Sequence, residues 1–117
     1  MSGRTSYLAG LSAEEIVARH YLAKGCEIRA TRWRGLKGEI DLIVQDGARL
    51  IFVEVKKSRD FAQAAERLRP SQMQRIYVSA SEFLTGEPEG QNSETRFDVA
   101  LVDAGGALQV IENAFGH

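Results

Sequence analysis

Two neighbouring stretches in the first half of the chain have the residue pattern of β-strands. Residues 39–45 have the sequence EIDLIVQ and residues 50–57 the sequence LIFVEVKK, and both are rich in branched apolar residues. The connection at 46–49 begins with Asp-Gly, which between two such runs predicts a hairpin. Three more strands are predicted over residues 27–34, 96–102 and 107–111.

Two stretches with helical periodicity complete the pattern. Residues 12–24 begin with a capping box formed by Ser12 and Glu15, and Gly25 suits the end of that helix. Pro70 begins a second helix, whose apolar residues recur at helical spacing. The remaining segments are a loop or short helix at 61–68 and a polar surface loop at 87–95. The order αβββαββ predicts a mixed sheet with helices packed against it.

Glu14 is the unusual residue of the first predicted helix. On a helical wheel it lies at the centre of an arc of four apolar residues, Val17, Ala18, Tyr21 and Leu22. A carboxylate in that position loses hydration unless it has a partner. The alternative is that an acid in the first turn favours the helix dipole and reaches solvent. The helix by itself favours this alternative.

The composition is that of an ordinary globular protein, with 44% hydrophobic and 26% charged residues in a chain of 117. This length predicts a single domain over residues 1–117. Cys26 is the only cysteine, which excludes an internal disulfide, and there are too few soft ligands for a zinc site. The N-terminus meets polar and acidic residues too early for a signal peptide, and no apolar run approaches the ~20 residues that span a bilayer. We therefore expect a cytoplasmic protein with no membrane partner.

The net charge of −1 conceals an uneven distribution of charge along the chain. Residues 29–75 contain 11 Lys and Arg against 6 Asp and Glu, a net charge of +5, whereas residues 76–117 contain one Arg against 7 acidic residues, a net charge of −6. A basic middle section would attract a polyanion. Taken by itself, the charge pattern is explained more simply by a mixed solvated surface.

The residues that carry candidate chemistry lie on the two strands of the hairpin. Side chains alternate along a strand, so Glu54 and Lys56 lie on one face. If the hairpin loop has two or four residues, Asp41 lies on the same face, opposite Phe52 or Glu54, whereas an odd loop would put it on the other side of the sheet. The even register brings two carboxylates and an ammonium group together.

Such a cluster suits a hard divalent cation. Mg²⁺ (or Mn²⁺) takes oxygen ligands, commonly one or two carboxylates together with waters and substrate phosphate. Asp41 and Glu54 would hold the metal, and Lys56 would orient or deprotonate the attacking water. The alternative is a cross-strand ion pair on a solvated face, because Asp-x₁₂-Glu-x-Lys is by itself a weak pattern.

Three sequence blocks resemble a known family: GEIDLI at 38–43, FVEVK at 52–56 and RFDV at 96–99. They resemble the bacterial YraN-like family of uncharacterised proteins, which is itself similar to the PD-(D/E)xK nuclease superfamily and notably to the archaeal Holliday-junction resolvases. The resemblance covers residues 13 to about 110. It implies an α/β, restriction-endonuclease-like fold, with a central mixed β-sheet flanked by helices.

The resemblance also implies roles for particular residues. Asp41 and Glu54 match the metal ligands, and Lys56 matches the catalytic lysine. Glu14 matches a helix-borne acid of the resolvase-like members and becomes the fourth catalytic candidate. Asp98 matches the third block and is expected to be structural.

The chain departs from the wider pattern at three positions. Ile40 stands where the superfamily has proline. Ser58 stands where an arginine often follows the lysine, with Arg59 as a substitute, and Gln72 stands in place of a common lysine. The departures at Ser58 and Gln72 concern contacts with the substrate backbone.

Basic residues before and after the candidate site are expected to contact nucleic-acid phosphates: Arg32, Arg34, Lys37, Lys57 and Arg59. Trp33 has the chemistry to stack on a base. Because tryptophan in a small domain more often belongs to the core, we expect it there.

Three functions are compatible with these residues. The first is a Mg²⁺-dependent endonuclease acting on DNA, including branched DNA, by metal-assisted phosphodiester hydrolysis. Symmetric cutting of both strands of a junction would require a C₂ homodimer, which this hypothesis includes. The second is a nucleic-acid-binding module that keeps the fold without cutting. The third is a protein-interaction domain in which the charged cluster is an ion-pair network.

Overall fold

The computed structural model describes residues 11–114. Residues 1–10, which carry part of the signal-peptide argument, and residues 115–117 lie outside the described residues. The elements are α2 (Ala13–Ala23), β1 (Glu27–Arg34), β2 (Glu39–Asp46), β3 (Arg49–Lys57), α3 (Phe61–Glu66), α4 (Pro70–Leu84), the 3-10 helix η1 (Gly90–Asn92), β4 (Glu94–Val102) and β5 (Leu108–Ile111). None of the helices described is long and apolar enough to cross a membrane.

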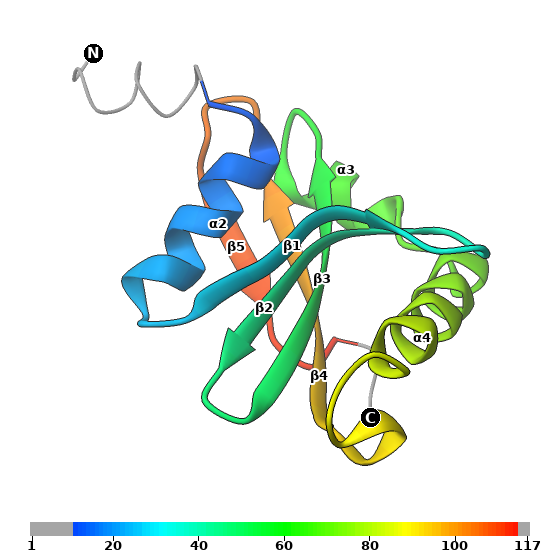
Figure 1. Cartoon of the computed structure of the whole chain (residues 1–117). Helices are drawn as coiled ribbons and strands as arrows, with labels where there is room; N and C mark the ends of the chain where they lie inside the picture. Colours follow the sequence, from blue (N-terminus) through cyan, green and yellow to red (C-terminus); the bar gives the residue numbers. More distant parts are fainter. Residues whose placement is uncertain (1–10, 115–117) are drawn as a thin grey trace.

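The five strands form one mixed sheet in the order β1-β2-β3-β4-β5 (Figure 1). All neighbours are antiparallel except β3 and β4, which are parallel and are connected through α3 and α4. A parallel pair needs such a crossover, and helices commonly supply it. The predicted α/β class, with a central mixed sheet flanked by helices, is confirmed, and the arrangement is consistent with a restriction-endonuclease-like fold.

Helix α2 has the predicted ends but a different buried side. Its N-cap is Ser12, whose hydroxyl accepts a hydrogen bond from Glu15 N at 3.1 Å. The buried residues are Ala13, Ile16, Val17 and Tyr21. The predicted arc was wrong at Leu22, which is 53% exposed, because the buried face is rotated toward Ala13 and Ile16. Glu14 consequently lies half-buried at the border of this face and not at its centre.

The β2–β3 hairpin closes with a two-residue loop, since Asp46 pairs with Arg49. Gly47 is the first loop residue and has φ +61°, while Ala48 is not among the residues with positive φ. These are the φ signs of a type II′ turn, in which glycine is favoured at the first central position. The predicted hairpin is confirmed, with its turn centred one residue beyond the Asp-Gly step.

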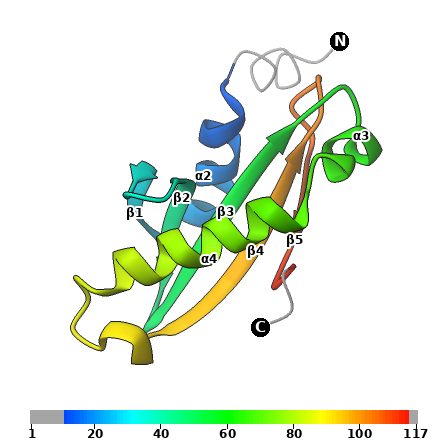
Figure 2. The ribbon, with the colours of Figure 1, turned by 90° about the vertical axis from the view of Figure 1, so that its right-hand side faces the viewer.

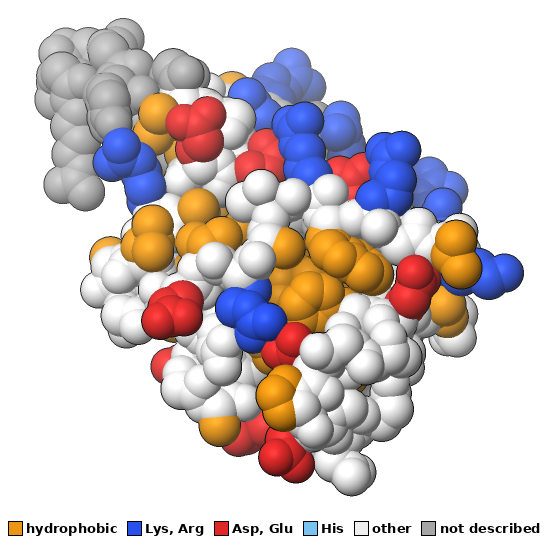
Figure 3. All heavy atoms as spheres, viewed as in Figure 1, with side chains coloured by type: hydrophobic (Ala, Val, Ile, Leu, Met, Phe, Trp, Pro, Cys, Tyr) orange, Lys and Arg blue, Asp and Glu red, His pale blue; other side chains and the backbone are white. Residues whose placement is uncertain are grey.

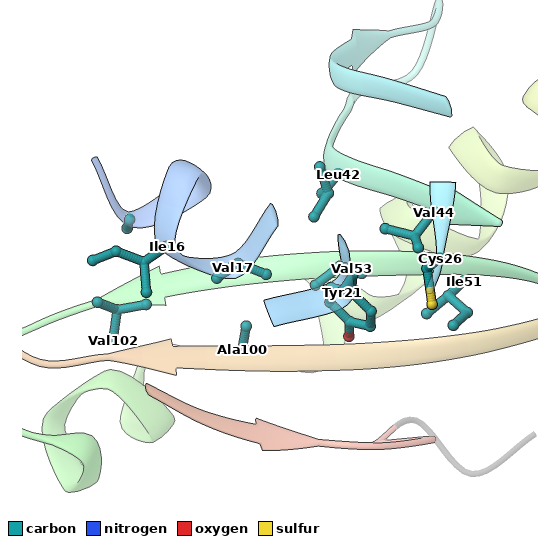
Figure 4. Close-up of a cluster of buried hydrophobic side chains, with 11 residues drawn as sticks. Ile16, Val17, Tyr21, Cys26, Leu42, Val44, Ile51, Val53, Ala100 and Val102 are labelled. Carbon is teal, nitrogen blue, oxygen red and sulfur yellow. The ribbon is translucent and has the colours of Figure 1, made fainter. Parts of the chain in front are cut away.

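Strand β3 lies at the centre of the sheet and contributes to the core on both faces, as predicted. Ile51 and Val53 pack under α2, where Figure 4 shows them with Val17 and Tyr21. Phe52 faces the other way and packs with residues of α4. Figure 2 shows α4 running across that second face of the sheet. Trp33 joins this second core, 5.5 Å from the Phe83 ring, as expected.

Asp98 on β4 is fully buried and connects three parts of the fold. Its carboxylate accepts hydrogen bonds from the Tyr21 hydroxyl at 2.6 Å, from Arg96 Nε and Nη2 at 2.9 Å each, and from Asn113 N at 3.0 Å. Because every oxygen has a donor, the buried charge is compensated. This arrangement fits the structural role that the sequence suggested for Asp98.

Candidate functional site

The hairpin register brings the two predicted metal ligands to the same end of the sheet. The β2–β3 ladder runs from Asp46 and Arg49 to Leu42 and Val53, so its continuation places Asp41 opposite Glu54. The even register required by the sequence argument is therefore present. Beyond the ladder, Asp41 Oδ2 accepts a hydrogen bond from Val55 N at 2.8 Å. This bond fixes the position of the Asp41 carboxylate.

Strand β2 departs from strict alternation just before Asp41. Leu42 belongs to the core under α2, and alternation would put Ile40 on the same side. Ile40 instead packs in the core under α4. The end of the strand is therefore twisted. Asp41 consequently lies near Glu14 of α2, which acts on its pKa, and beside the hollow that Gln72 and Arg75 of α4 also line.

Lys56 is held between two groups of different elements. Its Nζ lies 2.8 Å from Glu54 Oε1, and the two side chains are only 13% and 12% exposed. In the amide orientation that satisfies its neighbours, Gln72 accepts from Lys56 Nζ at 3.0 Å and donates to the Arg67 carbonyl at 2.7 Å. Gln72, noted in the sequence as a departure from the family pattern, thus contacts the candidate catalytic lysine from the first turn of α4.

The environment favours the protonated form of Asp41. Burial raises the pKa of its carboxyl to about 7, and the negative charge of Glu54 adds to this effect, as does Glu14 more weakly. The Val55 N–H opposes it, and a hydrogen bond with the Glu54 side chain favours the neutral form. Two carboxyl groups this close repel each other when both are ionised. A shared proton relieves that repulsion, and a bound divalent cation would relieve it equally.

A hollow opens beside this pair. It has a volume of about 270 Å³ and is lined by Gly38, Glu39, Asp41, Glu54, Gln72, Arg75 and Ile76. A water molecule occupies about 30 Å³ in the liquid, so the hollow has room for a hydrated ion or a phosphate group. Carboxylates lie on its strand side, and an arginine lies on its helix side.

The donor set fits an open magnesium-type site better than a closed structural one. Within residues 11–114 no group of three or more His, Cys, Asp or Glu side chains is arranged to hold a metal ion. Of the three carboxylates that line the hollow, Asp41 and Glu54 interact with each other, whereas Glu39 is paired with Arg34 at 3.2 Å. Mg²⁺ is commonly bound through one or two carboxylates, with waters and substrate phosphates completing its six ligands. The residues present therefore fit such an ion.

Glu14 lies near this pair but does not line the same hollow. Its charge acts on Asp41, yet its side chain borders a separate hollow of about 260 Å³ between α2 and β1. Arg32, which has an unusual φ of +50°, borders that hollow too. The structure thus brings Asp41, Glu54 and Lys56 together and leaves Glu14 at the edge of the group.

The five predicted phosphate-contacting residues, Arg32, Arg34, Lys37, Lys57 and Arg59, are all exposed. Arg34 forms a surface ion pair with Glu39 at 3.2 Å. Figure 3 shows Lys and Arg side chains gathered along the upper edge of one face, in the region of α3 and the turn that joins β1 to β2. A basic border therefore adjoins the candidate site.

Sequence reasoning missed three arginines of the α3–α4 segment. Arg75 lines the hollow of Asp41 and Glu54. Arg67 and Arg69, together with Ser58, line a neighbouring hollow of about 400 Å³. The signal that could have found them is the charge count, because all three belong to the basic section 29–75.

Comparison with known proteins gives a family but names no activity. A family model described as uncharacterised protein family UPF0102 matches residues 13–102. A UPF0102 protein of Cereibacter sphaeroides is 61% identical over 115 residues, covering 98% of each chain. A UPF0102 protein of Ruegeria pomeroyi is 54% identical, covering 98% of this chain and 94% of the relative. One of Dinoroseobacter shibae is 45% identical, covering 95% and 83%. The chain therefore belongs to the uncharacterised protein family UPF0102, the YraN-like family that its sequence motifs resemble.

Proposed function

We propose that this protein is a Mg²⁺- or Mn²⁺-dependent endonuclease that acts on DNA, including branched DNA, as a single endonuclease-like domain over residues 1–117. The observation that supports it most is the convergence of Asp41, Glu54 and Lys56 beside one hollow. The ion pair of Glu54 and Lys56 measures 2.8 Å, and Asp41 shares a hydrogen bond with Glu54. Two acids in this arrangement can hold a metal ion that activates water, and a lysine beside them can orient that water or act as a base.

Each side chain has a separate task in this proposal. Asp41 and Glu54 would hold the cation, which when bound supplies positive charge to the phosphate and makes a bound water more acidic. Lys56 would orient the attacking water through its ammonium group, which Glu54 and Gln72 hold in place, or would take the proton of that water in its neutral amine form. Arg75, on the opposite wall, contacts the phosphate that enters.

The test is cleavage of four-way junction, flap, single-stranded and duplex DNA with Mg²⁺ or Mn²⁺. Lys56→Ala is expected to reduce the rate by at least about 10²-fold, because it removes the proton-transfer or orienting group. Lys24→Ala is the matched control, since this lysine follows the end of α2 and its side chain is 55% exposed. Equal cutting by the wild type and Lys56→Ala would show that catalysis does not occur at this site.

A non-catalytic nucleic-acid-binding module is the second candidate function. The observation that favours it is that Lys56 is already engaged by Glu54 and Gln72 without any substrate. Binding that weakens steeply with salt, with no cleavage in either metal, would select this alternative. The same binding and cleavage measurements on an RNA duplex and an RNA single strand distinguish DNA from RNA as the substrate. Sedimentation of the DNA complex shows whether the protein binds as the C₂ homodimer that symmetric cutting would require.

A further inference from the structure

The turn between β1 and β2, residues 35–38, leads directly into the candidate site. Gly35 N donates a hydrogen bond to the Gly38 carbonyl at 2.9 Å, which closes the turn. Gly38 lines the hollow that contains Asp41 and Glu54. The end of this turn at Gly38 therefore borders the hollow, whereas its tip lies farther along α4, at Glu82, and Figure 2 shows the turn beside that helix.

This turn is fixed to α4 by its backbone. Both carboxylate oxygens of Glu82 accept a hydrogen bond from Leu36 N, at 2.9 and 3.0 Å. Gly35 lies flat against the same carboxylate, because a Cβ at this position would stand 2.5 Å from Glu82 Oε1. A Cβ at Gly38 would stand 3.2 Å from Ser79 Oγ. Two glycines are thus used for close approach, and the turn is held in one conformation.

The side chain at the tip of this fixed turn is apolar and almost wholly in solvent. Leu36 is 92% exposed, more than the other exposed large hydrophobic residues described, Leu22, Val78 and Ile111. Basic residues flank it, with Arg34 79% exposed at the side chain and Lys37 exposed as well. An isolated surface leucine is ordinary. Leu36 differs because a fixed turn holds it between two basic residues, and the same turn leads into the hollow at Gly38. This combination suits a polyanion that has apolar surfaces between its charges, as nucleic acid has between its phosphates.

We propose that Leu36 is a wedge that inserts between stacked bases of the bound nucleic acid. Arg34 and Lys37 contact the phosphates on either side, and the leucine opens a base step on the nucleic acid whose phosphate enters the Asp41–Glu54 hollow. Apolar side chains that enter a base step in this way unstack it at a cost of a few kcal/mol. DNA whose stacking is already interrupted, at a branch point or flap, costs less to open. This proposal rests on the proposed function and names its preferred substrate class as DNA with interrupted stacking.

The test measures base unstacking without cleavage. A four-way junction and a flap carry 2-aminopurine at the branch point, and its fluorescence rises when the base leaves the stack. Binding is measured in EDTA for the wild type, Leu36→Ala and Leu22→Ala. Leu22 is the matched control, since it is an exposed leucine on α2. Leu36→Ala is expected to lose most of the fluorescence rise while binding weakens by less than about tenfold, and Leu22→Ala is expected to match the wild type.

Several outcomes would overturn the wedge. One is a full fluorescence rise with Leu36→Ala, and another is no rise with the wild type. A third is an effect of Leu36→Ala only on sedimentation, because this would make Leu36 a contact between two copies of the chain. Lys56→Ala separates the two proposals, because it is expected to abolish cutting and to keep the rise. A rise that depends on Leu36 without any cleavage by the wild type leaves the wedge standing and refutes the nuclease.

Discussion

At the residue scale, the carboxyl group of Asp41 is the most informative single group. Its hydrogen bond from Val55 N favours the ionised form, yet burial and the nearby Glu54 outweigh that bond and raise its pKa to about 7. Structural acids in ion pairs usually show the opposite shift. An acid kept partly protonated near neutral pH beside a second acid is typical of functional sites, where stability is given up for chemistry.

This shift predicts a pH dependence of stability in metal-free buffer. The native protein binds more protons at Asp41 than the unfolded chain between the ordinary pKa of 3.8 and about 7. The stabilising contribution of this group is therefore complete below that window and is lost as the pH rises through it. Asp41→Asn keeps an acceptor for Val55 N but removes the charge. We expect it to raise the free energy of unfolding relative to the wild type at pH 8, by an amount on the order of 1 kcal/mol, and to have little effect at pH 4.

Chemical denaturation with a chelator present, at both pH values, measures this difference. A variant that follows the wild type at pH 8 would mean that Asp41 is not destabilising in the native state.

At the scale of elements, local signals located the helices and strands, and packing decided their faces. Ser12 and Gly25 marked the ends of α2 because capping depends on neighbouring backbone groups. Leu22 was assigned to the core wrongly, since which side of α2 is buried depends on how the helix is set on the sheet. Segment 61–68, for which the sequence left a loop and a helix open, contains α3, capped by Asp60.

The link between α2 and β4 gives a second stability prediction. Tyr21→Phe removes the hydroxyl that donates to Asp98 at 2.6 Å and leaves a buried carboxylate with one donor fewer. We expect a loss of about 1.5–3 kcal/mol in the free energy of unfolding, which is the usual contribution of a hydrogen bond to a charged group. Urea unfolding followed by circular dichroism measures it. If the midpoint stayed unchanged, the remaining donors, Arg96 and Asn113, would be sufficient for Asp98.

At the scale of the whole molecule, the uneven charge along the chain becomes a basic border next to the candidate site. Lys57 and Arg59 are exposed at the end of β3 that carries Glu54. Arg29 and Arg49 are instead engaged in ion pairs with Glu87 and Glu94, at 2.9 and 3.1 Å. The overall charge of −1 therefore says little about the field near the hollow.

This arrangement predicts the salt dependence of DNA binding. Each phosphate contact contributes about 0.9 to the slope of log K against log salt on duplex DNA. Replacing Lys57 and Arg59 by glutamine is expected to lower the magnitude of the slope by about 1–2. The control is the double replacement of Arg29 and Arg49 by glutamine, which removes the same charge and should leave the slope nearly unchanged. Fluorescence anisotropy between 50 and 200 mM salt, about the range over which such binding changes steeply, provides the measurement. Equal slopes for both double variants would exclude this border as the binding surface.

The sequence by itself determined where the helices and strands lie, because caps and turns are local, but it left open whether the hairpin loop has an even or an odd number of residues. Because the loop at Gly47 has two residues, the continued register places Asp41 opposite Glu54. Only the tertiary structure decided that Gln72 contacts Lys56, that Glu82 fixes the turn at Leu36, and that Glu14 stands at the border of the site. These contacts join segments far apart in the chain. Their geometry follows from how α2 and α4 are packed on the sheet, and no local pattern encodes it.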